Sequence, residues 1–447
     1  MDRLIKLDEA LGYDRKRTRE GYREYVNPGL VSMMTLLDFD KRFTRAEGVK
    51  VWDSRGNAYL DFLGGYGALN FGHNPPVVIE ALRRIEGVPN ILQASLNPLA
   101  AALAENLAMI TPGDLKISFF CNSGTEAVDA ALKMARLCSG RSRILLCKNS
   151  FHGKSFSPTL SDCSAVEYDN LEALEKHLAA RDVAAVIAEA IQGEGGIMVP
   201  RTGYLKGMRQ LCDKYGVLLI MDEIQTGMGR TGEYFACQHE GVAPDIMCLA
   251  KSLGGGMVPI GACIANSRVY KKAYGSMDKC LLLTSTFGGN SMAMAAGIAS
   301  VEYMVENRLD RRAAQLGDYA LERLRGMKEK YPLIKDVRGR GLMLGIEFES
   351  GEGSLLDRVS GGVASKLGRE YMGAVVAGEL LNKYRIITAY TLKNPNVIRL
   401  EPPLVVEREQ MDYMLDSLEK ILKANKGALS MVVSSVKSSV ASRFKTR

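Results

Sequence analysis

The chain has 447 residues, of which 47% are hydrophobic and 24% charged, a composition that excludes a mainly disordered protein and leaves room for more than one domain. No apolar run approaches the roughly 18 residues of a membrane-spanning helix. Seven Lys and Arg and no acid lie in residues 420–447, which accounts for the whole net charge of +7. The rest of the chain therefore has no positive surplus that would favour nucleic-acid binding.

The N-terminus and the cysteines predict a cytoplasmic protein. Asp2, Asp8 and Glu9 interrupt the N-terminal segment, so we expect no signal peptide. The nine cysteines form no Cys-x-x-Cys pair, and the four histidines have no zinc-finger spacing. We therefore expect reduced thiols and no metal site.

Short apolar segments alternate with helix-like segments through the middle of the chain. We predict strands at 117–121, 144–147, 183–188, 217–221, 246–249 and 260–264, with helices such as 126–137 and 203–214 between them. This alternation predicts an α/β fold with a mostly parallel sheet and helices on both of its faces. Ligands bind beyond the carboxyl ends of the strands in such a sheet.

The two ends of the chain differ from the middle. Residues 1–60 and 306–425 combine charged helices with a strand pair at 337–347, and we predict that they form one smaller α+β domain. Residues 61–305 would form the large domain. The basic tail at 426–447 has apolar side chains on one helical face, which favours packing on its own subunit over contact with a membrane surface or a partner protein.

A Ser-Gly-Thr turn follows the first strand of the predicted sheet and opens a helix. The first N–H groups of a helix have no acceptor within the helix, and they carry the positive end of its dipole. Together with the hydroxyls of Ser123 and Thr125 they would bind a phosphate. The alternative is an ordinary helix cap without a ligand.

Two ionisable side chains follow later strands. Asp222 comes directly after the strand at 217–221, where a carboxylate needs a protonated heterocycle nitrogen, a metal ion, an arginine or a helix cap as its partner. Lys251 follows the strand at 246–249, where burial would lower its pKa and make the amine a nucleophile, although a lone lysine there is more often exposed. Because successive parallel strands end at one edge, phosphate turn, acid and lysine together describe a pyridoxal phosphate site.

Longer motifs carry a family resemblance. The segment Met-Asp-Glu-Ile-Gln-Thr-Gly-Met-Gly-Arg-Thr-Gly at 221–232, followed by Ala-Lys-Ser-Leu-Gly-Gly-Gly at 250–256, resembles the class III (ω-amino) aminotransferases of fold type I. The resemblance extends from about residue 25 to residue 422. Within the class the chain is most similar to putrescine aminotransferases, and next to acetylornithine and ornithine aminotransferases. The segments that carry this finer likeness are 24–29, 119–126, 151–155 and 398–403.

The resemblance implies a role for each residue of a cofactor site. Lys251 would bind pyridoxal 5′-phosphate covalently and later move a proton between the substrate carbon and the cofactor. Asp222 would pair with the ring nitrogen, Gln225 would contact the ring hydroxyl, and Phe151 would stack on the ring.

The phosphate would have contacts from two subunits. The resemblance assigns it to Gly124 and Thr125, next to Ser123. Thr286 would reach the phosphate of the neighbouring subunit's cofactor. This implies a homodimer with shared active sites.

Three further residues concern the substrates. Arg399 matches the family arginine that binds the α-carboxylate of 2-oxoglutarate, and Glu194 matches the carboxylate that pairs with it when an amine donor is bound, because an unpaired buried guanidinium is costly. The alternative for Arg399 is a structural salt bridge. Lys154 stands where ornithine and acetylornithine relatives usually carry an arginine that clamps a carboxylate, which favours a diamine donor.

Two departures from the family pattern concern the pocket. The segment between Phe151 and Val166 is shorter than in most relatives, which would open the pocket to bulkier amines or aldehydes. Ala190 replaces a usual proline, and we expect no effect. His152 lies beside a cofactor residue, and we interpret it as structural.

We therefore predict an aminotransferase that moves the terminal amino group of a putrescine-like diamine to 2-oxoglutarate in a ping-pong cycle. One alternative is an acetylornithine or ornithine aminotransferase of arginine metabolism. Others are the reverse reaction on a natural-product aldehyde, an aminomutase or racemase, and a non-catalytic binding protein.

Overall fold

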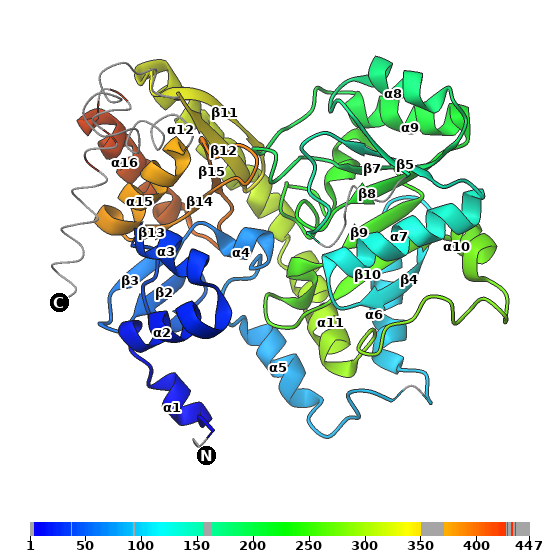
Figure 1. The fold of residues 1–447 in the computed structure, drawn as a ribbon, viewed down its shortest axis with the longest axis horizontal. Coiled ribbons are helices and arrows are strands. Elements are labelled where there is room, and N and C mark those ends of the chain that lie inside the picture. Colours follow the sequence, from blue (N-terminus) through cyan, green and yellow to red (C-terminus); the bar gives the residue numbers. More distant parts are fainter. Residues whose placement is uncertain are drawn as a thin grey trace.

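The fold has two halves that do not follow chain order. The structure, a computed structural model, describes residues 4–36, 38–92, 94–154, 162–349, 371–425, 427, 431 and 434. In Figure 1 the cyan and green elements from the middle of the chain fill the right-hand half, and the blue and orange-to-red elements of the two chain ends lie together on the left.

A seven-stranded sheet forms the centre of the right-hand half, in the order β4-β10-β9-β8-β7-β5-β6. Its strands are β4 (Leu115–Cys121), β5 (Arg143–Cys147), β6 (Cys163–Val166), β7 (Val183–Glu189), β8 (Leu218–Asp222), β9 (Ile246–Leu249) and β10 (Gly261–Asn266). Only β10 runs antiparallel to its neighbours within this sheet. The predicted α/β fold with a mostly parallel sheet is confirmed.

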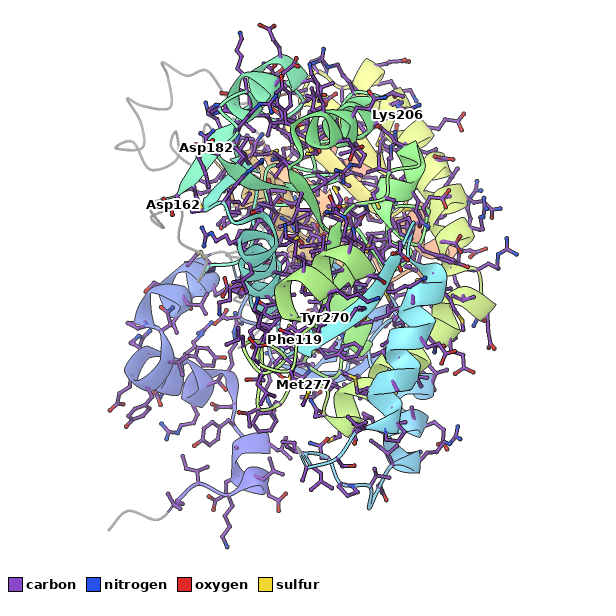
Figure 2. The ribbon with its side chains drawn as sticks, turned by 90° about the vertical axis from the view of Figure 1, so that its right-hand side faces the viewer. Phe119, Asp162, Asp182, Lys206, Tyr270 and Met277 are labelled. Atoms are coloured by element: carbon purple, nitrogen blue, oxygen red, sulfur yellow. The ribbon has the colours of Figure 1, made fainter. Side chains whose placement is uncertain are left out.

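The edge strand β6 is the one member of this sheet that the sequence analysis did not predict. It is short, and only one of its four residues is buried. Figure 2 labels Asp162, which precedes β6, and Asp182, which precedes β7, at the outer edge of the molecule. By contrast, every residue of β7 and β8 is buried, as expected for strands that are covered on both faces.

Helices cover both faces of the large sheet. They are α5 (Pro76–Arg84), α6 (Pro98–Ile110), α7 (Gly124–Ser139), α8 (Leu171–Leu178), α9 (Tyr204–Tyr215), α10 (Ser267–Tyr274) and α11 (Ser291–Glu306). α7 packs against β4, β9 and β10 through an almost continuous apolar face. The predicted helices at 126–137 and 203–214 correspond to α7 and α9.

Two four-stranded sheets lie in the left-hand half. One has the order β1-β2-β3-β13 and the other β11-β12-β15-β14. The strands are β1 (Phe43–Glu47), β2 (Lys50–Asp53), β3 (Ala58–Asp61), β11 (Ile334–Arg340), β12 (Met343–Phe348), β13 (Ile386–Ile387), β14 (Ala389–Tyr390) and β15 (Val397–Leu400). β13 pairs with β3, so the two chain ends share a sheet. The domain boundaries at residues 60, 305 and 425 stay predictions.

The remaining described helices complete this half and the loops. They are α1 (Leu7–Leu11), α2 (Arg15–Gly21), η1 (Tyr22–Val26), α3 (Pro28–Leu36), α4 (Gly64–Gly67), η2 (Ala236–Glu240), η3 (Lys251–Gly254), α12 (Leu309–Lys330), α15 (Met372–Tyr384) and α16 (Arg408–Ala424). Within the described ranges, no helix combines the length and apolarity that crossing a membrane requires.

The described part of the tail packs on its own chain. Met431 is fully buried, and Ser434 Oγ donates a hydrogen bond to Glu379 Oε2 of α15 at 3.0 Å. Most of the predicted apolar face of the tail lies outside the described residues.

Candidate active site

A cavity of about 410 Å³ opens beyond the carboxyl ends of the parallel strands. Most of the residues singled out from the sequence line it. Among its lining residues are Ser123, Gly124, Thr125, Phe151, Glu194, Asp222, Gln225 and Lys251. The topology thus brings together side chains that lie more than a hundred residues apart.

The N-terminus of α7 faces one end of the cavity. Ser123 is its N-cap, and the Ser123 Oγ accepts a hydrogen bond from the backbone N–H of Glu126 at 3.2 Å. Gly153 packs so closely here that a Cβ on it would lie 2.4 Å from Thr125 Oγ1. The first turn of α7 and Gly153 therefore adjoin, and the first N–H groups of α7 have no acceptor within the helix.

Asp222 ends β8 with both of its oxygens engaged. Its Oδ2 lies 2.7 Å from Nδ1 of His152, and its Oδ1 accepts a hydrogen bond from the N–H of Ile224 at 3.1 Å. Burial alone would lower the pKa of His152, but the hydrogen bond and charge of Asp222 outweigh it, so the pKa lies above its usual value. His152 is thus buried and hydrogen-bonded, as the structural interpretation expects, and its ring also lines the cavity.

Glu189 is a second carboxylate at this edge, which the sequence analysis did not single out. It ends β7 in register with Asp222 on β8. Its two oxygens accept hydrogen bonds from the backbone N–H groups of Phe151 at 2.8 Å and Gly193 at 3.0 Å. Burial raises the pKa of Glu189 to about 7. Glu189 thus links the backbone at Phe151 to the backbone at Gly193.

Lys251 begins η3 directly after β9, and its backbone has a φ of +49°. This left-handed conformation is costly for a residue with a side chain, and such strain concentrates at functional sites. The side chain lines the cavity, where burial lowers its pKa. A larger fraction of neutral amine results, which is the form that can act as a nucleophile.

Gln225 is held between two loops. Its Nε2 donates to the carbonyl of Tyr66 at 2.9 Å. Gly193 approaches the other side of its amide, and a Cβ on Gly193 would lie only 1.6 Å from Gln225 Oε1. Only glycine fits at position 193 while Gln225 keeps this orientation.

Arg399 lies behind the cavity wall and is fully buried. Its Nη2 is 2.7 Å from Oε2 of Glu194, and its Nη1 is 3.2 Å from Oε2 of Glu401. The ring of Tyr66 stacks over the guanidinium, with the centroid 5.2 Å away. Glu194 lines the cavity and Arg399 does not, so Glu194 separates the arginine from a ligand.

Two of the predicted site residues stand apart from this cavity. Lys154 and Thr286 are exposed and do not line it. Most of the shortened segment after Phe151, residues 155–161, lies outside the described residues, so its predicted effect on the pocket stays a prediction.

Comparison with known protein families matches one family to most of the chain. The family Aminotransferase class-III matches residues 38–171 and 157–422. The chain therefore belongs to the class III aminotransferases, enzymes that transfer amino groups with pyridoxal phosphate. Aminotransferase chemistry and the cofactor are thus confirmed.

Solved structures of similar proteins are ornithine and acetylornithine aminotransferases. The ornithine aminotransferase of Toxoplasma gondii ME49 is 29% identical with a TM-score of 0.80, over 99% of this chain and 100% of that one. The acetylornithine aminotransferase of Elizabethkingia anophelis is 31% identical with a TM-score of 0.76, over 92% and 99%. A second Toxoplasma gondii structure has PLP at partial occupancy in its active site. These neighbours favour the ornithine-type alternative over putrescine.

The donor set of the cavity fits pyridoxal phosphate. It offers a helix N-terminus with two hydroxyls at one end and a buried carboxylate at the other. The Lys251 amine and the Phe151 ring lie in the same lining. Each part of the cofactor would therefore have a chemically matched neighbour. These parts are its phosphate, its protonated ring nitrogen, its aldehyde and its flat aromatic face.

Proposed function

We propose that the chain moves the terminal amino group of an ornithine-type ω-amine, ornithine or N-acetylornithine, to 2-oxoglutarate in a ping-pong cycle. The observation that carries this proposal is the ion pair between Glu194 and Arg399. The same pocket must accept a keto acid in one half-reaction and an amine without the matching carboxylate in the other. A carboxylate that can leave a buried guanidinium meets both needs, because the guanidinium is never left unpaired.

We assign the chemistry to Lys251 and Asp222. Pyridoxal phosphate, when bound, supplies the electron sink that stabilises negative charge on the substrate carbon. Lys251 binds the cofactor through its neutral amine and carries the proton to and from the substrate carbon. Asp222, oriented by His152, holds the proton on the ring nitrogen. Gln225 orients the ring through its hydroxyl, and Phe151 covers one ring face.

We assign the phosphate to Ser123, Gly124 and Thr125 at the start of α7. In a homodimer Thr286 would add a contact at the neighbouring subunit's site. The exposed position of Thr286 supports this, as do the large apolar side chains exposed in the same segment. Met277 is 95% exposed, Leu281 78% and Phe287 55%. Met277 is labelled in Figure 2 on the side of the molecule that faces the viewer there.

Putrescine is a second candidate donor, and the position of Lys154 favours it. The exposed Lys154 side chain lies outside the cavity lining, so it offers no bidentate clamp for the carboxylate of ornithine or acetylornithine. A diamine without a carboxylate has no need of this clamp.

A donor panel tests the proposal. Glutamate formed from 2-oxoglutarate is measured with ornithine, N-acetylornithine and putrescine as donors, with Lys251→Ala as the matched inactive control. Turnover with at least one of these ω-amines is expected, and the order of kcat/KM ranks them. Turnover with none of the three donors would refute an ω-amine transfer.

A further inference from the structure

Glu401 is a fully buried acid next to the site, and neither the sequence analysis nor the proposed mechanism gives it a role. It follows β15 directly, and its Oε2 lies 3.2 Å from Nη1 of Arg399. Its other oxygen, Oε1, is buried and has no hydrogen-bond donor among the described residues. A buried acceptor without a donor costs free energy, so a neutral side chain would be expected here if packing alone mattered.

Arg399 lies between two carboxylates. Its guanidinium is paired with Glu194 and Glu401, and the charge of Glu401 also acts on the buried Arg230. Burial opposes the charge of the guanidinium, but the two carboxylates outweigh this and raise the pKa of Arg399. Glu401 thus has two buried guanidinium groups near it, and its loss would remove one negative charge from behind the cavity wall.

The two carboxylates differ in their freedom to move. Glu194 lines the cavity, its side chain is 16% exposed, and its Oε2 accepts a hydrogen bond from the N–H of Leu392 at 2.9 Å. Glu401 is enclosed, and its backbone is clamped. Its N–H donates to the carbonyl of Phe62 at 2.8 Å, and a Cβ on Gly64, whose φ is +56°, would lie 2.2 Å from its carbonyl oxygen. Glu194 can leave Arg399, whereas Glu401 stays.

The negative charge of Glu401 acts on the amine of Lys251. Burial is the largest effect on Lys251 and lowers its pKa, and among the charges that act against this lowering Glu401 is the strongest. A charge that acts on Lys251 also acts on a substrate bound beside it.

We propose that Glu401 is a specificity-determining residue, a fixed negative charge behind Arg399 that favours cationic amine donors and disfavours anionic keto acids in this cavity. The proposal rests on the proposed function, in which Arg399 receives the keto acid's α-carboxylate. When 2-oxoglutarate displaces Glu194 from Arg399, it adds two negative charges near Glu401, while the displaced Glu194 stays close. A diamine instead adds positive charge that Glu401 attracts.

The test removes the charge and keeps the shape. Glu401→Gln is compared with wild-type holoenzyme through the KM of each donor and the Kd of 2-oxoglutarate, measured by calorimetry. We expect the effect to follow ligand charge. The KM should rise by about tenfold for putrescine, rise less for ornithine and change least for N-acetylornithine, while the Kd of 2-oxoglutarate falls severalfold.

Three further variants separate charge from structure. Glu401→Asp retains the charge and should preserve the wild-type order of ligands. Glu379→Gln removes another fully buried carboxylate, on α15, and should not shift cationic and anionic ligands in opposite directions. If Glu401→Gln does not fold, Glu401→Ala removes the same charge and must show the same order.

The outcomes are distinct. Opposite shifts for cations and anions support the proposal. If Glu401→Gln weakens the binding of all ligands alike, or changes none of the KM and Kd values, the proposal is overturned and Glu401 is a structural residue. Failure of the wild type to form glutamate with any ω-amine would instead refute the proposed function, and the calorimetric Kd of 2-oxoglutarate would still report on Glu401.

Discussion

His152 and Asp222 meet at the edge of the large sheet, with Nδ1 of the ring 2.7 Å from Oδ2 of the carboxylate and both side chains about 96% buried. A second hydrogen bond, from the N–H of Ile224, fixes the other oxygen. Asp222 is therefore held in one orientation before any ligand binds. Such preorganisation is what an acid that keeps a ring nitrogen protonated requires.

The first prediction concerns this pair. His152→Ala removes a hydrogen bond to a charged group, and we expect cofactor affinity or kcat to fall by about tenfold to a hundredfold. His152→Asn, which retains a donor at a similar place, should recover part of the loss. Titration of the apoenzyme with cofactor measures the affinity, with His239→Ala as the control outside this cavity. Wild-type affinity and kcat in His152→Ala would mean that the pair has no positioning role.

The second prediction concerns Gly193. An added methyl group would lie 1.6 Å from Gln225 Oε1, so Gly193→Ala must displace the amide and break its hydrogen bond to Tyr66. We expect at least a tenfold loss of kcat/KM with little loss of fold, because the collision involves a side chain at the cavity. Gly326→Ala is the control, since no atom lies within 4 Å of its added Cβ. Equal kcat/KM for the two variants would contradict the position of Gln225.

The third prediction uses the raised pKa of Glu189. The folded pKa is about 7 and the ordinary value is 4.5, so the folded state retains a proton that the unfolded state releases. This contribution to stability is fully present below about pH 4.5 and is lost as the pH rises through about 7. Glu189→Gln cannot titrate. The stability of the wild type relative to this variant should therefore fall, by on the order of 3 kcal/mol, as the pH rises across that window.

Thermal unfolding of both proteins across this pH range measures the difference. A difference that does not vary with pH would show that folding does not raise the pKa of Glu189.

The fourth prediction concerns Arg230, which lies in the motif at 221–232 and is fully buried. Its guanidinium donates to the carbonyls of Leu342 at 3.0 Å and Pro402 at 2.5 Å and to Asn70 Oδ1 at 2.6 Å. Burial lowers its pKa to about 10. It ties this motif to the residues after β15, so Arg230→Met should destabilise the fold by about 3 kcal/mol or more.

The free energy of unfolding checks this prediction, with the exposed Arg325→Met as the control, which should change stability by less than about 0.5 kcal/mol. Similar values for the two variants would contradict the role of Arg230.

The large sheet and the gathering of Asp222 and Lys251 at one cavity could be predicted from the sequence because their signals are local. β7 and β8 are continuous apolar runs, and Asp222 and Lys251 come directly after strands. The ends of parallel strands meet at one edge, so the sequence alone places these side chains together. The edge strand β6 has no such signal, since it is short and largely unburied.

The partners of the cofactor residues were missed because their signals are not local. His152 reaches Asp222 across 70 positions of sequence, and no spacing rule reports such a contact. Glu189 could have been found, since it ends a buried strand as Asp222 does. Glu401 has no sequence signal of its own, because its importance comes from the burial of Arg399 between two acids. We propose that these contacts select the amine donor, so the local motifs that predicted the cofactor could not predict the donor.

Covalent attachment of pyridoxal phosphate to Lys251 in this cavity can be tested by chemical trapping. The holoenzyme is reduced with borohydride, digested, and mapped by mass spectrometry. We expect a single peptide, the one that contains Lys251, with the mass of the reduced cofactor added, and no such peptide in Lys251→Ala. The cofactor attached to a different lysine, or an unchanged adduct in Lys251→Ala, would contradict it.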